Sequence, residues 1–395
     1  MNPRSIRRSL VFYFSSEVFL SLGIGFIIYV QPFFYRQGGL SDSTIGLLFA
    51  VNALAGGLAA LLFGSAADRI GASRVFKVST LAIALSYLLL SATHSLAAWA
   101  TASALSGLAG AMLMSTENVV LSSLTKGHEM ASVLSKFVAL YTFIIGIGVV
   151  TSGILSSSIG YPATLRIGAL IALVAPLIRI FVKAPDAKSE RLIRIPSKRI
   201  WAMSLFAMLF GLSLSLFNPF ATLVLHGTFR LSDSSTALIS SISIFMMSFG
   251  SLLVSALVRR FRRERTLFYT FAASIGMTLL MILPGSGAGF TAFYLGRTVL
   301  TSVPGSIVDA MFLQLTHETE YVQMFGVRVF GTNVGNAAGS YGGGLFLSHS
   351  AIAWMLGLSA LGLIVTYLYL LWLIKRLHSA RQNVHNDATG MGLEA

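Results

Sequence analysis

Residues 64–77 read GSAADRIGASRVFK, a short polar stretch set between two long apolar blocks at about 44–66 and 76–93. A helix that crosses a bilayer needs about 20 apolar residues, and each of these blocks has that length. The stretch is therefore predicted to be a loop at one membrane surface, between two consecutive spanning helices. The same pattern of apolar blocks and short loops recurs along almost the whole chain.

The composition supports this interpretation. Only 11% of the 395 residues are charged and 55% are apolar, whereas a soluble domain carries roughly 25% charged residues. The first apolar run is too long for the core of a signal peptide, so it is predicted to be a retained helix. We predict an all-α integral membrane protein with twelve transmembrane helices, at about 10–35, 44–66, 76–93, 97–123, 133–156, 161–182, 200–226, 235–257, 267–284, 289–314, 324–347 and 351–374.

An internal repeat divides the chain. Leu40-Ser-Asp-Ser-Thr44 recurs 191 residues later as Leu231-Ser-Asp-Ser-Ser235, and a second pair of similar segments has the same offset. Asp42 and Asp233 each precede a predicted helix, so we expect them to be helix caps rather than substrate gates. The predicted parts are two pseudo-symmetric six-helix bundles at 1–182 and 200–377, a cytoplasmic linker at 183–199 and a disordered cytoplasmic tail at 378–395.

The formal net charge is +14. In a soluble protein this excess would suggest nucleic acid, but in a membrane protein Lys and Arg collect in cytoplasmic loops. If both termini are cytoplasmic, nearly all of the 28 Lys and Arg face the cytoplasm, including those from Arg179 through the linker. We therefore predict a multi-pass protein of the inner or plasma membrane, with both termini cytoplasmic and no nucleic-acid partner.

The loop at 64–77 contains a spaced motif. Gly64 allows close approach between helices, Asp68 can face a helix N-terminus or a basic partner, and Gly71 permits a tight turn. Arg69 and Arg74 are expected to hold the cytoplasmic face together. The motif resembles the signature between the second and third helices of the major facilitator superfamily (MFS), and the resemblance extends over essentially the whole chain. It implies the MFS fold and a cytoplasmic gate motif that stabilises the outward-facing state.

The loop at 259–265, in the equivalent place of the second half, keeps a basic run but lacks the glycines and the aspartate. This run is expected to face solvent or lipid headgroups. Many drug/proton antiporters of the family have an arginine in the fourth helix and a Gly-Pro pair in the fifth. This chain has Ser106 at the repeat-equivalent of Arg297, and its fifth helix has glycines without proline.

Five charged residues fall within predicted spans, where burial costs several kcal/mol and therefore marks functional candidates. They are Glu17, Glu117, Arg166, Arg297 and Asp309. The family resemblance places all of them except Arg166 on the helices that line the central cavity. Arg166 lies near the external end of its helix, where its long side chain can reach the headgroups.

These charges have alternative roles. Glu17 lies roughly 12 Å into its helix, where it either loads and releases protons or pairs with a buried partner. Arg297 is expected to be the counter-charge to Glu17 or an anchor for an anionic substrate. Glu117 and Asp309 either contribute to an inner gate or pair with basic loop residues. Further hydrogen bonds to a substrate are expected from polar residues of the cavity: Asn52, Tyr141, Asn218, Asn333 and Asn336.

Four glycines at a spacing of four, Gly331, Gly335, Gly339 and Gly343, predict a helix face that a neighbouring helix approaches closely, and we expect a rocking interface there.

The leading functional hypothesis is secondary transport of a small molecule by alternating access, with proton-coupled export. The 28 Phe and 14 Met suit a cavity for amphipathic compounds. Proton-coupled uptake of a nutrient or metabolite, and lipid or lysolipid translocation, are the alternatives. The chain has no Cys, no metal-binding His spacing and no phosphate-cradling Gly-Lys-Ser/Thr loop. We therefore expect no enzyme activity, no cofactor and no metal, and a monomer whose partners are substrate, protons and the lipid bilayer.

Overall fold

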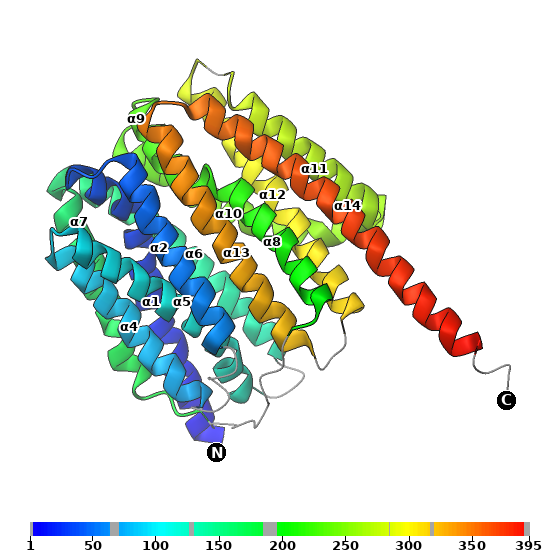
Figure 1. Ribbon diagram of the computed structural model, residues 1–395. Coiled ribbons are helices and arrows are strands. Elements are labelled where there is room, and N and C mark those ends of the chain that lie inside the picture. The colour runs from blue at the N-terminus through cyan, green and yellow to red at the C-terminus, as the bar shows by residue number, and fades with distance from the viewer. Residues whose placement is uncertain are drawn as a thin grey trace.

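The computed structural model describes residues 3–63, 71–125, 130–184, 196–283, 285–316 and 320–390. Its helices form one elongated bundle (Figure 1). They are α1 Pro3–Gln37, α2 Asp42–Phe63, α4 Ala72–Ala92, α5 Leu96–Ser123, α6 Met130–Ile159, α7 Tyr161–Arg179, α8 Lys198–Ser215, η2 Asn218–Phe220, α9 Ala221–Gly227, α10 Asp233–Phe261, α11 Arg263–Leu280, α12 Gly287–Leu315, α13 Tyr321–Ser348 and α14 Ile352–Gly390.

The predicted all-helical fold with 12 spanning helices is confirmed, with α8, η2 and α9 forming a single span. Within the described ranges, 10 spans are long and apolar enough to cross a membrane by composition alone. The other two have local reasons for lower hydropathy. α11 begins with Arg263, Glu264 and Arg265. α13 is rich in glycine and packs between α2 and α8, so little of it needs an apolar surface toward lipid.

The helix boundaries repeat with the offset found in the sequence. α2, α4, α5, α6 and α7 begin at residues 42, 72, 96, 130 and 161, whereas α10, α11, α12, α13 and α14 begin at 233, 263, 287, 321 and 352. Each pair differs by 191. Such a register across five helices indicates that both halves have the same order of elements.

Two helix pairs make the most extensive contacts between the halves in the described part of the chain. In the first half α1 packs on α6 and α7, and α4 packs on α5 and α7; in the second half α8 packs on α13 and α14, and α12 packs on α10 and α11. Across the boundary, α2 packs on α13 and α6 packs on α10. These two contacts are equivalent under the repeat, because α2 corresponds to α10 and α6 to α13.

The glycine stripe of α13 faces its own half. A Cβ at Gly331, Gly335, Gly339 or Gly343 would meet backbone atoms of residues 204–216, in α8 and at its end. The close helix approach is therefore present, but it lies within the second half, and the expectation of a rocking interface at this stripe is wrong. The face of α13 that meets the first half carries Gly344 instead, whose Cβ would lie 3.1 Å from the Cα of Gly46 on α2.

Serines cap the two helices that follow the repeated Leu-Ser-Asp segment. The Oγ of Ser41 accepts a hydrogen bond from the backbone N–H of Thr44 at 3.3 Å, and that of Ser232 accepts one from Ser235 at 3.2 Å. The expectation that Asp42 and Asp233 are the caps is therefore wrong. Their carboxylates are free for longer-range contacts.

The last helix, α14, is longer than the predicted span. The backbone of α14 continues as a helix to Gly390, so residues 378–390 are helical where a disordered tail was expected. No proline or glycine interrupts this segment before Gly390, and the helix extends away from the bundle (Figure 1).

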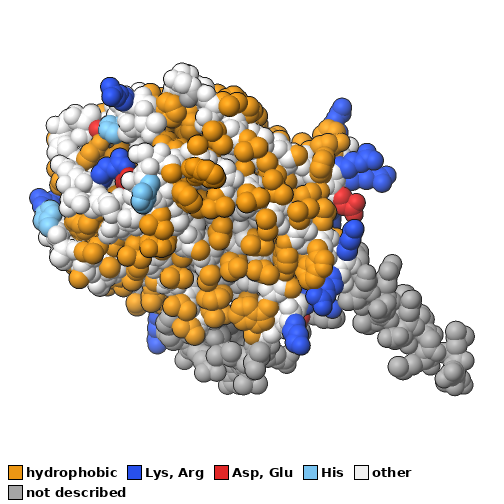
Figure 2. Space-filling view, turned by 45° about the horizontal axis from the view of Figure 1, so that its top comes forward, with side chains coloured by type: hydrophobic (Ala, Val, Ile, Leu, Met, Phe, Trp, Pro, Cys, Tyr) orange, Lys and Arg blue, Asp and Glu red, His pale blue; other side chains and the backbone are white. Residues whose placement is uncertain are grey.

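Lys and Arg side chains gather mainly toward the two ends of the molecule, and hydrophobic side chains cover much of the area between them (Figure 2). This distribution suits a protein embedded in a bilayer.

Candidate functional site

A buried arginine organises the first half. Arg179, the last residue of α7, is fully buried, and its Nη2 lies 2.6 Å from Oε2 of Glu17 on α1. The same nitrogen lies 3.5 Å from Oε1 of Glu117 on α5. The side chains of Glu17 and Glu117 are only 5% and 15% exposed. One guanidinium therefore faces two carboxylates from two other helices.

Neutral groups hold this cluster in place. Arg179 donates from Nε to the Oγ of Ser16 at 3.1 Å and from Nη1 to the hydroxyl of Thr80. Its guanidinium carbon lies 4.1 Å from the ring centroid of Phe76. The Oγ of Ser21 donates to Oε1 of Glu17 at 2.6 Å. With donors used on several sides, the guanidinium has a single orientation between the helices.

The charges of this cluster do not balance. If Glu17 and Glu117 are both ionised, the three charged side chains carry one net negative charge in a site withdrawn from water. Uncompensated buried charge is costly, which distinguishes this cluster from a balanced ion pair. We refer to Glu17, Glu117 and Arg179 as the acidic triad.

The triad was only partly anticipated. Glu17 has a buried partner, as one alternative held, but the partner is Arg179 and not Arg297, so the expected Glu17–Arg297 pair is wrong. Arg179 had been counted with the cytoplasmic charges because it is followed by a basic linker. The sequence does contain a signal, since apolar Ile180, Phe181 and Val182 follow Arg179 and place it inside the apolar block.

A second buried arginine organises the other half. Arg297 on α12 is 1% exposed. It donates from Nη1 to Oδ1 of Asn218 at 2.6 Å, from Nε to the hydroxyl of Thr278 at 3.0 Å, and from Nη2 to the Oγ of Ser359 at 3.2 Å. Its guanidinium carbon lies 5.6 Å from the ring centroid of Phe217. Among the described acidic residues, none lies within ion-pair distance of Arg297, so this site carries a net positive charge.

The two arginines join equivalent sets of helices. Arg179 connects α7 with α1, α4 and α5, whereas Arg297 connects α12 with α11, α14 and the span that contains η2. Under the 191-residue repeat these are the same four positions in each half. The arginine comes from a different helix in each case, and among the described residues only those of the first half supply carboxylates to their arginine.

Asn218 lies at a break in the seventh span. Pro219, which lacks a backbone N–H, follows it, and α8 ends at Ser215 before the 3₁₀ turn η2. A cavity of about 340 Å³ lies beside the break. Its polar lining comprises Ser215, Asn218, Arg328, Thr332 and Asn336, and its apolar lining includes Phe206 and Phe210. This combination suits a small molecule with apolar and hydrogen-bonding parts.

The remaining cavity candidates fall into two groups. Asp309 pairs with Arg328, which lines the cavity, so its partner lies on the neighbouring helix α13. Glu117 belongs to the acidic triad, so neither acid pairs with a loop residue in the described part of the chain. Asn52 donates to the backbone oxygen of Ser103 at 3.0 Å, which ties α2 to α5. Asn218 and Asp309 are therefore associated with the cavity, whereas Asn52 is used in helix packing.

Asp233 connects the two halves at the end of the bundle where α7 and α10 begin. Its Oδ1 accepts a hydrogen bond from the hydroxyl of Tyr161 at 2.7 Å and lies 3.5 Å from Nδ1 of His226. The hydroxyl of Tyr29 donates to the backbone oxygen of Asp233 at 2.7 Å. Tyr29 and Tyr161 belong to the first half, and Asp233 and His226 to the second. The repeat-equivalent Asp42 pairs instead with Arg36 of its own half, at 2.6 Å.

Three of the gate-motif residues, Gly64, Asp68 and Arg69, lie outside the described residues. Gly71 precedes α4 with a φ of 104°, a conformation that favours glycine, as the predicted tight turn requires. Arg74 is exposed in the first turn of α4. Arg166 is also exposed, and its Nε lies 3.5 Å from the backbone oxygen of Ser91.

The fold, with its two repeat-related helical halves, is that of a class of membrane transporters. The chain belongs to the Major Facilitator Superfamily, whose sequence profile matches residues 13–302 and 203–390. The family membership that the loop at 64–77 indicated is thereby confirmed. The chain is thus a member of a family of membrane transporters.

Individual relatives are more distant. The chain is 25% identical over 146 residues to "Quinolone resistance protein NorA" of Staphylococcus aureus (strain N315), which covers 36% of this chain and 37% of NorA. The chain thus matches little more than a third of that relative's length. Among solved structures, a mutant of the nucleoside transporter NupG has a TM-score of 0.77 at 14% identity, covering 92% of this chain and 99% of NupG. A bacterial homologue of the iron transporter ferroportin, in an inward-facing state, has a TM-score of 0.74 at 16% identity, covering 94% and 99%. Identities this low establish the shared fold alone.

Proposed function

We propose that this protein is a proton-coupled exporter that works by alternating access between its two six-helix halves. The observation that carries the proposal is the acidic triad. Two carboxylates share one guanidinium in a site that is almost closed to water. A transporter driven by protons needs a group that binds a proton on one side of the membrane and releases it on the other, and the triad supplies such a group.

Glu117 is the better candidate for the proton that exchanges. It lies farther from Arg179 than Glu17 does, at 3.5 Å against 2.6 Å, and its side chain is more exposed. Glu17 also accepts a hydrogen bond from the hydroxyl of Ser21. Glu17 is therefore held by two short contacts as the partner of Arg179, whereas Glu117 can be protonated with less loss of interaction.

The substrate is proposed to bind in the cavity of the second half. Asn218, Asn336 and Arg328 line it, and Arg297 lies directly behind Asn218. Since Arg297 has no acidic partner among the described residues, we expect a positive electrostatic potential in this cavity. A substrate with an electron-rich or anionic group beside an aromatic part would be favoured here. Asp309 can modulate the site through its pairing with Arg328.

The direction of transport rests on similarity to NorA, whose printed name refers to quinolone resistance, and this similarity covers about a third of the chain. The positive-inside distribution of charge supports cytoplasmic termini and a plasma-membrane location. With this orientation, the contacts around Asp233 lie on the external side. We propose that they close that side and open when the halves rock. A monomer contains both halves and is sufficient for this cycle.

The test uses everted membrane vesicles from cells that produce the full chain, with a quinolone as the first probe and other amphipathic compounds as further probes. Respiration acidifies the vesicle interior, so an exporter that exchanges protons for substrate should accumulate the probe. A protonophore and Glu117→Gln should each abolish accumulation. Glu320→Gln, which removes a carboxyl at the start of α13, is the matched control.

Accumulation that ignores the pH gradient, or that is unchanged in both Glu117→Gln and Glu17→Gln, would contradict proton coupling. Gradient-dependent loss of probe from preloaded vesicles would instead indicate uptake in cells and reverse the proposed direction.

A further inference from the structure

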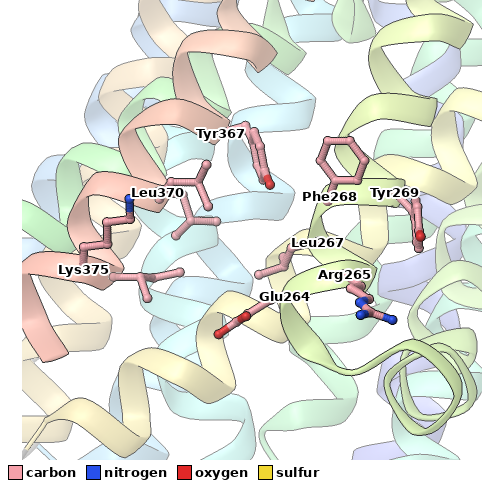
Figure 3. A pocket seen from close by; sticks show the side chains of 10 residues that line it. Glu264, Arg265, Leu267, Phe268, Tyr269, Tyr367, Leu370 and Lys375 are labelled. Atoms are coloured by element: carbon pink, nitrogen blue, oxygen red, sulfur yellow. The ribbon is translucent and has the colours of Figure 1, made fainter.

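A second cavity, of about 420 Å³, opens on the outer surface of the second half between α11 and α14 (Figure 3). All of its lining residues come from these two helices, near the start of α11 and the stretch of α14 around Lys375. It shares no residue with the cavity beside Asn218. We refer to it as the lateral groove.

The lateral groove has an apolar floor and apolar walls. Leu267 and Leu370 form its floor and are 2% and 0% exposed. Phe268 and Leu371 are 51% and 39% exposed at its rim. The ring of Tyr367 lies 6.2 Å from that of Phe268, across the groove. A hydrocarbon chain placed here would cover apolar surface on both helices.

Charged side chains occupy one end of the groove. Glu264, Arg265 and Lys375 are exposed there, whereas Tyr367 and Phe268 lie toward the other end (Figure 3). Tyr367 and Lys375 are eight positions apart on α14, which is about 12 Å along a helix. The groove thus changes from charged to apolar over a distance comparable to the step from lipid headgroup to acyl chain.

The charge at this end is strongly positive. Four more arginines precede Arg265, at 259, 260, 262 and 263, and Glu264 is the only acid among them. Within the described residues, neither Arg265 nor Glu264 takes part in an ion pair. Arg263 is used in a hydrogen bond to Gln314 at 2.6 Å. Arg265 is therefore available to an anion that approaches from the membrane.

We propose that the lateral groove is a binding site for one anionic phospholipid. Its phosphate contacts Arg265 and Lys375, and one acyl chain lies along Leu371, Phe268 and Tyr367. A free phosphate could not use the apolar walls, and the ammonium of a zwitterionic headgroup would lie unfavourably beside the basic run. The predicted orientation puts this end in the cytoplasmic leaflet, where basic residues attract anionic lipid. Lipid binding here does not depend on proton-coupled transport.

The test is native mass spectrometry of the purified full-length protein after incubation with palmitoyl-oleoyl phosphatidylglycerol or phosphatidylcholine. The wild type should retain one phosphatidylglycerol at concentrations where phosphatidylcholine is lost. The Arg265→Gln/Lys375→Gln double variant should bind the first phosphatidylglycerol about tenfold more weakly, because two surface cations near the headgroup are removed. Leu371→Trp, which fills the groove without changing charge, should also weaken binding.

The matched control is Arg259→Gln/Arg260→Gln, which removes the same charge from the end of α10 but leaves the groove unchanged. It should weaken phosphatidylglycerol binding clearly less than the Arg265→Gln/Lys375→Gln variant does, because Arg259 and Arg260 contribute only long-range charge. Equal losses in both double variants would show a diffuse charge effect and overturn the site. Equal retention of the two lipids, or a lipid-free dimer that is lost in Leu371→Trp, would also overturn it; the dimer would identify a second copy of this chain as the occupant.

Discussion

The Nη2 atom of Arg179 lies 2.6 Å from Oε2 of Glu17, although the two residues are 162 positions apart in the chain. Both side chains are buried, so each neutralises a charge that the interior would otherwise not tolerate. Because Glu117 shares the same guanidinium, Arg179 is a structural element and also sets the charge of the site at which we place proton binding.

Arg179→Gln should destabilise the protein by about 3–5 kcal/mol, because it leaves two buried carboxylates without a cation. The apparent melting temperature, followed by circular dichroism in detergent, should fall clearly. The second substitution Glu17→Gln in the same chain should restore part of the loss. Arg166→Gln on the same helix is the control, since that side chain is exposed and makes one long contact. A melting temperature for Arg179→Gln equal to that of the control would refute the argument.

Arg297→Lys tests whether the second half needs a guanidinium or only a positive charge. The three acceptors of Arg297 lie on three elements, and an ammonium cannot reach them together from one position. We expect Arg297→Lys to raise the KM of flux severalfold and Arg297→Gln to raise it more. Arg230→Gln, in the loop between the predicted spans 200–226 and 235–257, should leave KM unchanged. An unchanged KM in Arg297→Gln would place the substrate away from this cavity.

Asp233→Asn should weaken the contacts that join the halves at the predicted external end. Hydrogen bonds to a charged group contribute about 1.5–3 kcal/mol, and the carboxylate accepts one from Tyr161. The chain has no Cys, so spin labels at Ser158→Cys and Thr228→Cys would report only the distance between these two exposed positions. In Asp233→Asn and in Tyr161→Phe, the distances between the two labels, measured by electron–electron double resonance, should both shift to longer values. Asp42→Asn is the control, because Asp42 pairs within one half. A distance distribution identical to the wild type in both variants would show that Asp233 does not hold the external side closed.

Gly335→Ala should destabilise the contact between α13 and α8. Its added Cβ would meet the backbone oxygen of Met208, and both helices would have to move apart. A cost of roughly 1–3 kcal/mol is typical of overpacking in a well-packed interior. Gly276→Ala on α11 is the control, since nothing lies within 4 Å of its added Cβ. Gly276→Ala should match or slightly exceed the wild type in melting temperature, because alanine favours the helix. Equal melting temperatures for the two variants would mean that the stripe tolerates separation of α13 and α8.

Local features of the sequence were sufficient for the architecture. A membrane span is recognised from the length of its own apolar block, without knowledge of the helices that pack against it. The repeated Leu-Ser-Asp segment likewise revealed the 191-residue offset that five helix starts now follow. Gly71 was also predictable, because a positive φ at a tight turn restricts the residue type at a single position.

Only the tertiary structure decided which charges meet. The partner of Glu17 depends on the rotation of α1 and α7 about their axes and on the depth of each side chain in the membrane. The hydropathy of the sequence gives neither of these. For this reason Arg179 could be mistaken for a loop charge and Arg297 for the partner of Glu17. The same holds for Asp42 and Asp233: their sequence contexts are nearly identical, yet one pairs within a half and the other joins the halves. The sequence by itself thus determined the number, order and repeat of the helices, because those depend on local length and composition. The polar sites were decided by packing, because they form between side chains that are distant along the chain.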